Sequence, residues 1–273
     1  MKDLKGKCAV VTGAGRGIGK RLAVGLAEAG CRVALVARTE TQLQLTQLEI
    51  EARNGTALCF PSDVCNSEQL SGTFREIRAH FGPVDVLVTA AGMQGPIGPF
   101  WETDEAEWAH TIATNLTGTM RAMRLVIPEM VAQRRGKLIA LGGRGVSHPR
   151  PYFTAYAASK AAIGRMVESL AEELLEHNVQ VNCLAPGHTY THMTDEILKA
   201  GSRAGWRDQE TALKVLQTGG VSPSKQIDPM LFLASSQSNH VTGKIIHVDD
   251  DWKTLLDSTV SADMFTLRRV QRA

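Results

Sequence analysis

Short apolar runs alternate with longer amphipathic segments along almost the whole chain of 273 residues. The apolar runs are hydrophobic throughout rather than at every second position, which is typical of strands buried on both faces. Strands that alternate with helices form a parallel sheet, and right-handed crossovers then place helices on both of its faces. The pattern therefore predicts an α/β fold with one doubly wound parallel sheet of seven strands.

The boundaries of these elements follow from the same pattern. We expect strands at Lys7–Thr12, Cys31–Ala37, Thr56–Phe60, Val84–Thr89, Lys137–Leu141, Val179–Leu184 and Ile245–Val248. We expect helices between them, at about Gly17–Ala29, Thr39–Arg53, Ser67–His80, Asp104–Gln133, Thr154–His177 and Ser224–Ser235.

Two segments interrupt the alternation, and neither has the composition of a linker between domains. Pro186–Pro223 contains no strand-like run, so we expect a pair of short helices with loops that forms a lid over the site. Residues 249–273 continue past the last strand as a C-terminal tail. Its acidic run, Asp249–Trp252, is predicted to be a solvated turn, since a metal site of oxygen ligands needs wider spacing. We expect a single domain over residues 1–273 and no metal.

The composition excludes several classes of protein. No apolar run approaches the roughly 20 residues that span a bilayer, and the N-terminus has no apolar signal-peptide region. A formal charge of +2 does not indicate binding to nucleic acid or to an anionic membrane. The five cysteines form no Cys-x-x-Cys pair, which favours buried thiols in a reducing compartment. We therefore expect a cytoplasmic protein with a small-molecule partner.

The first predicted strand ends in a glycine-rich turn, Thr12–Gly19, that leads into the first predicted helix. Gly13, Gly17 and Gly19 give the pattern Gly-x-x-x-Gly-x-Gly, with Ile18 between the last two. Glycines allow positive φ and close backbone approach, and a helix N-terminus directs backbone amides at phosphate. This turn predicts a dinucleotide-binding, Rossmann-type fold.

Tyr156 and Lys160 are four residues apart on a predicted helix, so their side chains share one face. With Asn115 and the glycine-rich turn, they resemble the short-chain dehydrogenase/reductase family in its single-domain form, over about residues 4–250. The resemblance implies that Tyr156 exchanges a proton with the substrate oxygen, that Lys160 holds the cofactor ribose, and that Asn115 positions a water in a proton relay. A neighbouring ammonium would also lower the pKa of the Tyr156 phenol.

One member of that family's catalytic set is absent from this chain. The family places a serine about a dozen residues before the tyrosine, and here Gly143 occupies the position 13 residues before Tyr156. The serine would donate a hydrogen bond to the reacting oxygen. Two replacements are open: backbone amides near Gly143, or a side chain of the following loop, from Arg144, Ser147 or His148. Arg144 would favour an acidic or phosphorylated substrate, and His188 is a further candidate for substrate contact.

The second predicted strand is followed by Arg38, where NAD-binding proteins carry an acidic residue that holds the ribose hydroxyls. A guanidinium suits a 2′-phosphate by charge and geometry, and Arg16 adds a second positive charge. We therefore expect NADP(H). The resemblance also implies cofactor contacts by Asp63, Val64, Ala91, Gly92, Pro186, Gly187, Thr189 and Thr191.

These residues predict an NADP(H)-dependent oxidoreductase that transfers a hydride between nicotinamide and a carbonyl/alcohol substrate, sugar-like or 3-oxoacyl in kind. Two alternatives remain open: a non-catalytic cofactor-binding sensor or partner subunit, and a lyase or epimerase that uses nicotinamide transiently. The two helices expected at Asp104–Gln133 and Thr154–His177 carry apolar residues on more than one face. In resembling proteins such helices pair between subunits, so we expect a homodimer or homotetramer.

Overall fold

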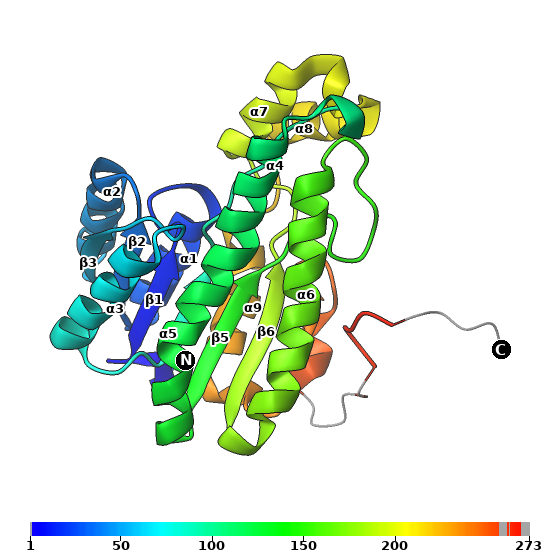
Figure 1. Cartoon of the computed structure of the whole chain (residues 1–273). Coiled ribbons are helices and arrows are strands. Elements are labelled where there is room, and N and C mark those ends of the chain that lie inside the picture. The colour runs from blue at the N-terminus through cyan, green and yellow to red at the C-terminus, as the bar shows by residue number, and fades with distance from the viewer. Residues whose placement is uncertain (1, 257–260, 262, 269–273) are drawn as a thin grey trace.

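The computed structural model describes residues 2–256, 261 and 263–268, and within them a single parallel sheet of seven strands runs in the order β3-β2-β1-β4-β5-β6-β7 (Figure 1). The strands are β1 (Cys8–Thr12), β2 (Arg32–Ala37), β3 (Thr56–Pro61), β4 (Val86–Thr89), β5 (Gly136–Leu141), β6 (Val179–Ala185) and β7 (Ile245–His247). The order reverses between β1 and β4, and ligands of such sheets bind beyond the carboxyl ends of the strands at that point. The predicted fold class is confirmed.

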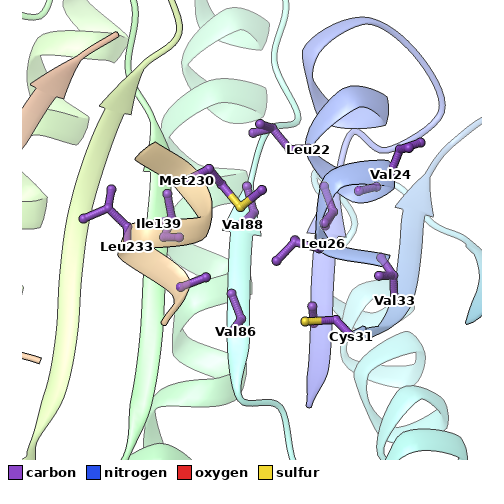
Figure 2. Packing of buried hydrophobic residues seen from close by; sticks show 14 of the residues in the cluster. Leu22, Val24, Leu26, Cys31, Val33, Val86, Val88, Ile139, Met230 and Leu233 are labelled. Atoms are coloured by element: carbon purple, nitrogen blue, oxygen red, sulfur yellow. The ribbon is translucent and has the colours of Figure 1, made fainter. Parts of the chain in front are cut away.

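Helices cover both faces of this sheet (Figure 1). One face packs against α1 (Gly17–Glu28), α2 (Glu40–Glu51) and α9 (Pro223–Ala234). Figure 2 shows this layer, in which Leu22 and Leu26 of α1 and Met230 of α9 lie around Val86 and Val88 of β4. Each fully buried side chain of this size contributes about 1.5–3 kcal/mol of transfer free energy. The other face packs against α3 (Ser67–Phe81), α5 (Gly118–Gln133) and α6 (Thr154–Leu174).

The prediction of one continuous helix over Asp104–Gln133 is wrong, because the structure divides this range into three parts. It contains α4 (Glu105–Ile112), a π-helical segment (Ala113–Thr117) and α5. A π turn adds one residue to a helical turn and is common at functional sites. Asn115 lies in this segment with no exposed surface, so the bulge orients its side chain into the protein. The hydrophobic pattern continues through such a bulge, which is why the sequence did not reveal it.

The segment predicted to form two short helices does so, as α7 (His192–Ala200) and α8 (Trp206–Thr218), joined by a 3₁₀ turn (Gly201–Ala204). Figure 1 shows α7 and α8 beyond one end of the sheet, next to α4. Thr191 caps α7 through a reciprocal capping box with Thr194. The predicted helix at Thr154–His177 ends earlier, at Leu174, and continues as a 3₁₀ turn (Leu175–His177).

The described part of the tail returns to the open edge of the sheet. The Ile245 amide of β7 donates to the Phe265 carbonyl at 2.7 Å. Arg268 forms an ion pair with Glu168 of α6 at 3.0 Å. Earlier in the tail, Trp252 packs against Phe232 with the ring centroids 5.3 Å apart. These contacts attach the tail to the domain.

Five free thiols are distributed through the domain, and three of them, Cys8, Cys31 and Cys183, are buried as predicted. Burial raises the pKa of each of these three thiols to about 12, so they are protonated at neutral pH. None of the helices in the described ranges combines the length and apolar character needed to cross a bilayer. Within the same ranges, no cluster of three or more His, Cys, Asp or Glu side chains is arranged for a metal ion.

Candidate active site

The glycine-rich turn connects β1 to α1 in a conformation that leaves no room for a side chain at Gly13 or Gly19. Gly13 and Gly17 have φ values of 70° and 57°, in the left-handed region that favours glycine. A Cβ on Gly13 would lie 2.7 Å from the Ala91 amide nitrogen, and one on Gly19 would clash with the Gly13 carbonyl. The turn therefore packs directly on the segment after β4, and it leads into the N-terminus of α1, whose backbone amides suit phosphate.

The two arginines predicted to select the cofactor lie next to this turn. Arg16 is the N-cap residue of α1, and Arg38 directly follows β2. Both residues are exposed. After β3, the Asp63 carboxylate accepts a hydrogen bond from the Cys65 amide at 2.8 Å, and Val64 is buried. The predicted nucleotide contacts therefore follow three adjacent strands at one edge of the sheet.

Tyr156 lies in the first turns of α6, next to the end of β5. Tyr156 is 9 % exposed. A Cβ built on Gly143 would clash with the Tyr156 hydroxyl and come within 3.3 Å of the Tyr156 Cζ atom. The structure thus places the hydroxyl of Tyr156 in the space that a side chain at position 143 would occupy. Any larger residue at 143 requires the tyrosine or the loop to move.

Lys160 and Asn115 lie on the inner side of the same site, around Gly92. The Lys160 ammonium donates to the Leu141 carbonyl at 2.8 Å, and its nitrogen is 5.6 Å from the Tyr156 ring centroid. The Asn115 amide accepts from the Met93 nitrogen at 2.8 Å and donates to the Met93 carbonyl at 3.0 Å. A Cβ on Gly92 would lie 3.3 Å from Asn115 Oδ1 and 3.9 Å from Lys160 Nζ. The three residues predicted to form the proton relay are therefore brought together.

Ser159 was not predicted as a site residue, although it connects Asn115 to α6. Its hydroxyl accepts from Asn115 Nδ2 at 3.0 Å and donates to the Tyr156 carbonyl at 2.7 Å. The residue is completely buried. These two hydrogen bonds fix the π-helical segment against the turn of α6 that carries Tyr156.

Arg150 is the second residue that the sequence did not reveal. Its guanidinium lies 3.9 Å from the Phe153 ring centroid and 5.1 Å from that of Tyr156. It donates twice to one carboxylate oxygen of Asp208 in α8, at 3.1 and 2.9 Å, and both side chains are buried. The other Asp208 oxygen lies 3.3 Å from an Arg144 nitrogen. One carboxylate of α8 is thus shared by two guanidiniums of the loop after β5.

The pKa of Tyr156 differs from the prediction. Burial raises the pKa of the phenol, and the cation that opposes the rise is the guanidinium of Arg150. Lys160 is not among the groups that shift this pKa, and its ammonium donates to the Leu141 carbonyl. Burial also lowers the pKa of Lys160 to about 8.

The segment after β6 forms the wall between the glycine-rich turn and α7. The Gln226 side chain of α9 donates to the Pro186 carbonyl at 2.7 Å and to the Thr189 hydroxyl at 2.6 Å. Thr191 reaches the glycine-rich turn, where its Cγ2 would lie 3.2 Å from a Cβ on Gly17. Gly187, between these residues, has a φ of 69°. This brings the predicted residues Pro186, Gly187, Thr189 and Thr191 next to the first predicted cofactor contacts.

The remaining predicted residues, Arg144, His148 and His188, line a cavity of about 770 Å³ beside Gly143. Its far wall includes His247 at the end of β7 and the tail residues Phe265–Leu267. The Ser147 hydroxyl lies 2.9 Å from His148 Nδ1, and both residues are exposed. His188 is also exposed by surface area, but surrounding protein atoms and the guanidiniums of Arg144 and Arg150 lower the pKa of its imidazole.

The family profile described as short chain dehydrogenase matches residues 7–201 of this chain. The chain therefore belongs to the short-chain dehydrogenase family.

Three relatives show the range of similarity. The chain is 33% identical to the 2,3-dihydro-2,3-dihydroxybenzoate dehydrogenase of Bacillus subtilis (strain 168), over 91% of this chain and 96% of that one. A gluconate 5-dehydrogenase from Burkholderia cenocepacia J2315, solved with NADP and tartrate, is 26% identical with a TM-score of 0.79, covering 93% and 98% of the two chains. An NAD⁺-bound xylitol dehydrogenase is 25% identical with a TM-score of 0.82, covering 90% and 98%.

Proposed function

We propose that this chain is an NADP(H)-dependent oxidoreductase acting on a small carbonyl/alcohol pair, with Tyr156 as the residue that exchanges a proton with the substrate oxygen. The observation that carries the proposal is the convergence of Tyr156, Lys160, Asn115 and Gly92 at the carboxyl end of β4 and β5. A non-catalytic binding protein has no use for such a group of proton donors and acceptors. The similarity to a xylitol and a gluconate dehydrogenase supports a sugar-like substrate.

The residues present suit a nicotinamide dinucleotide. Gly13 and Gly19 let the turn pack against the backbone of Ala90 and Ala91 and against itself, and this turn leads into the N-terminus of α1, whose backbone amides would face a pyrophosphate. Arg16 and Arg38 supply positive charge for a 2′-phosphate. The segment from Pro186 to Thr191 would hold the nicotinamide end. When bound, this cofactor supplies or accepts the hydride.

The protein's own residues handle the proton and the geometry. In reduction, the Tyr156 hydroxyl donates its proton to the substrate oxygen as the carbonyl becomes an alcohol, and in oxidation the phenolate removes that proton. The Arg150 guanidinium lowers the free energy of the phenolate, and Asp208 holds Arg150 in place. Asn115 and Lys160 supply the hydrogen-bonding groups through which the proton reaches solvent. The segment 186–223 excludes water as a lid.

A turnover assay with a matched variant tests this function. Wild-type protein and Tyr156→Phe are compared for NADPH oxidation with a panel of keto sugars and oxo acids. We expect the variant to lose about 10²–10⁴-fold in rate, because no other described group occupies the proton-donor position. Fluorescence titration with NADPH should show unchanged binding. Turnover that survives Tyr156→Phe would contradict the assignment, and cofactor binding without turnover of any carbonyl compound would favour a sensor.

We further propose a cytoplasmic homodimer or homotetramer with an isologous interface. The apolar residues on more than one face of α5 and α6 support it, since Leu125 and Met166 are only partly buried in the single chain. Light scattering at micromolar concentration should give a multiple of the 29.5 kDa chain mass. A monomer mass would exclude the assembly.

A further inference from the structure

The cluster of Arg144, Arg150 and Asp208 contains one more positive charge than negative charge. Arg150 and Asp208 are 8 % and 5 % exposed, and they satisfy each other through two hydrogen bonds. Arg144 is bound far less completely, since within the described residues its ion pairing is limited to one 3.3 Å contact with the same carboxylate. A guanidinium has five N–H donors, so most of the capacity of Arg144 is available to a ligand.

The cavity next to this cluster is also positively charged. Its lining includes the guanidiniums of Arg144 and Arg207, together with His148, His188 and His247. The one carboxylate in this lining is Asp250, which already accepts from the His247 amide at 2.7 Å. Its volume of about 770 Å³ lies within the usual range for small-molecule sites. Two arginines against one carboxylate favour an anion over a neutral or cationic ligand, and the three imidazoles add possible hydrogen-bond donors.

We propose that the substrate carries an oxyanion, a carboxylate or a phosphate ester, and that Arg144 binds this group in the cavity beside Gly143 while the Arg150–Asp208 pair holds the loop and α8 together. The inference rests on the function proposed above, because it identifies the substrate class of that site. Arg144 is adjacent in sequence to Gly143, against which the Tyr156 hydroxyl lies. Gly143 also lines the cavity of Arg144, so the proposal places the oxyanion and the reacting carbonyl in one small molecule, as in an oxo acid or a phosphorylated sugar.

The absence of a side chain at position 143 belongs to the same arrangement. The Tyr156 hydroxyl fills that space and leaves the loop backbone open to the cavity. Fixing the substrate by an ionic contact at Arg144 orients the reacting oxygen, which is the positioning that a serine donor would otherwise supply. Arg144 is thus a substrate-binding residue, and Asp208 is a positioning residue for both guanidiniums.

Binding of inert anions tests the site without turnover. Malonate, inorganic phosphate and neutral malonamide are titrated by calorimetry into wild-type protein, Arg144→Gln and Arg135→Gln, with NADP present at saturation. Arg135 is an exposed arginine at the opposite end of β5 and serves as the matched control. We expect malonate or phosphate to bind at least tenfold more tightly than malonamide, and Arg144→Gln to abolish this preference, whereas Arg135→Gln keeps it. Equal binding by wild type and Arg144→Gln would overturn the proposal, as would an equal loss of anion binding in Arg135→Gln.

A second arm separates this inference from the proposed function. Turnover of a small oxo acid, of its amide and of a phosphorylated ketose is compared in wild type and Arg144→Gln. We expect KM for the anionic substrates to rise at least tenfold in the variant, with kcat changed far less, and rescue in part by Arg144→Lys. Equal turnover of the acid and its amide would contradict the anion site while leaving the oxidoreductase function intact. If anion binding depends on Arg144 but no compound is turned over, the proposed oxidoreductase function is contradicted and the anion site is still supported.

Discussion

The proposed cofactor side and the proposed substrate side of this site are built by different means. On the cofactor side, the glycine-rich turn has its shape from backbone conformation, and the contacts of Gly13 and Gly19 are with nearby backbone atoms. On the substrate side, the loop after β5 is held by side chains, above all by the pair of Arg150 with Asp208, which are 58 residues apart. A backbone-defined region tolerates changes of surface side chains, whereas a side-chain-defined region can be rebuilt to take another substrate. The comparison explains how one fold keeps one cofactor chemistry and varies its substrates.

Among the changes that compare the two sides, the largest effect is expected from Gly143→Ser, which introduces a serine at the position where the family resemblance predicts one. A Cβ there meets the Tyr156 hydroxyl, so we expect turnover to fall by about 10²-fold through displacement of the tyrosine. Steady-state rates of Gly143→Ala separate the two effects of the change, because alanine adds the crowding atom without the hydroxyl. A rate for Gly143→Ser above wild type would show that this glycine is a lost donor, and the contrast between the two sides would fail.

The fold and the cofactor side could largely be predicted from the sequence, because their signals are local. The apolar runs predicted where the strands lie along the chain, and the spacing of Gly13, Gly17 and Gly19 indicated the turn. Lys160 shows where such reasoning ends: its spacing from Tyr156 was sufficient to place both on α6, but the direction of its ammonium depends on the Leu141 carbonyl of another element.

The substrate side could be predicted only in part. Arg144 was predicted because it follows Gly143, the position where the family resemblance implies a serine, whereas Arg150 resembles any loop arginine until α8 brings Asp208 against it. Asp208 itself lies on a helix with mixed polar and apolar residues, and its burial follows from tertiary packing alone. The one available signal was the position of Arg150 six residues before Tyr156, in the same loop as Gly143.

An intermediate effect is expected from Lys160→Met, which tests the buried centre that the two sides share. Burial lowers the pKa of Lys160 from 10.5 to about 8, with the Cys183 thiol as its neighbouring titratable group. The unfolded chain therefore binds more protons than the folded one between these values, so the stability of the wild type rises with pH across that window. At pH 7 the buried charge of Lys160 lowers the free energy of unfolding by on the order of 3 kcal/mol. The hydrogen bond to Leu141 offsets about 1 kcal/mol of this loss.

Urea unfolding at pH 7 and at pH 10 measures this difference. We expect Lys160→Met to be more stable than wild type by about 2 kcal/mol at pH 7, and the advantage to disappear at pH 10. A variant that is less stable than wild type at both pH values would show that Lys160 is held by favourable contacts. Lys160 would then stabilise the fold as part of the cofactor side, and its burial would not lower the stability of the protein.

The smallest effect is expected from Arg38→Asp on the cofactor side. The side chain is exposed, and its interaction with a 2′-phosphate is screened by solvent, so removing it should weaken NADP(H) binding by about tenfold. The new carboxylate repels the 2′-phosphate and can accept hydrogen bonds from the ribose hydroxyls of NAD(H), which should bind more tightly than before. Fluorescence titration of both cofactors measures the ratio, with Arg16→Gln as a second variant next to the same turn. The substitution leaves the backbone of the turn unchanged, so the backbone contacts to the pyrophosphate should remain. Either cofactor should therefore still bind with a Kd in the micromolar range or lower. Loss of all cofactor binding in Arg38→Asp would mean that the cofactor side also depends on one side chain, and the distinction between a backbone-defined and a side-chain-defined region would not hold.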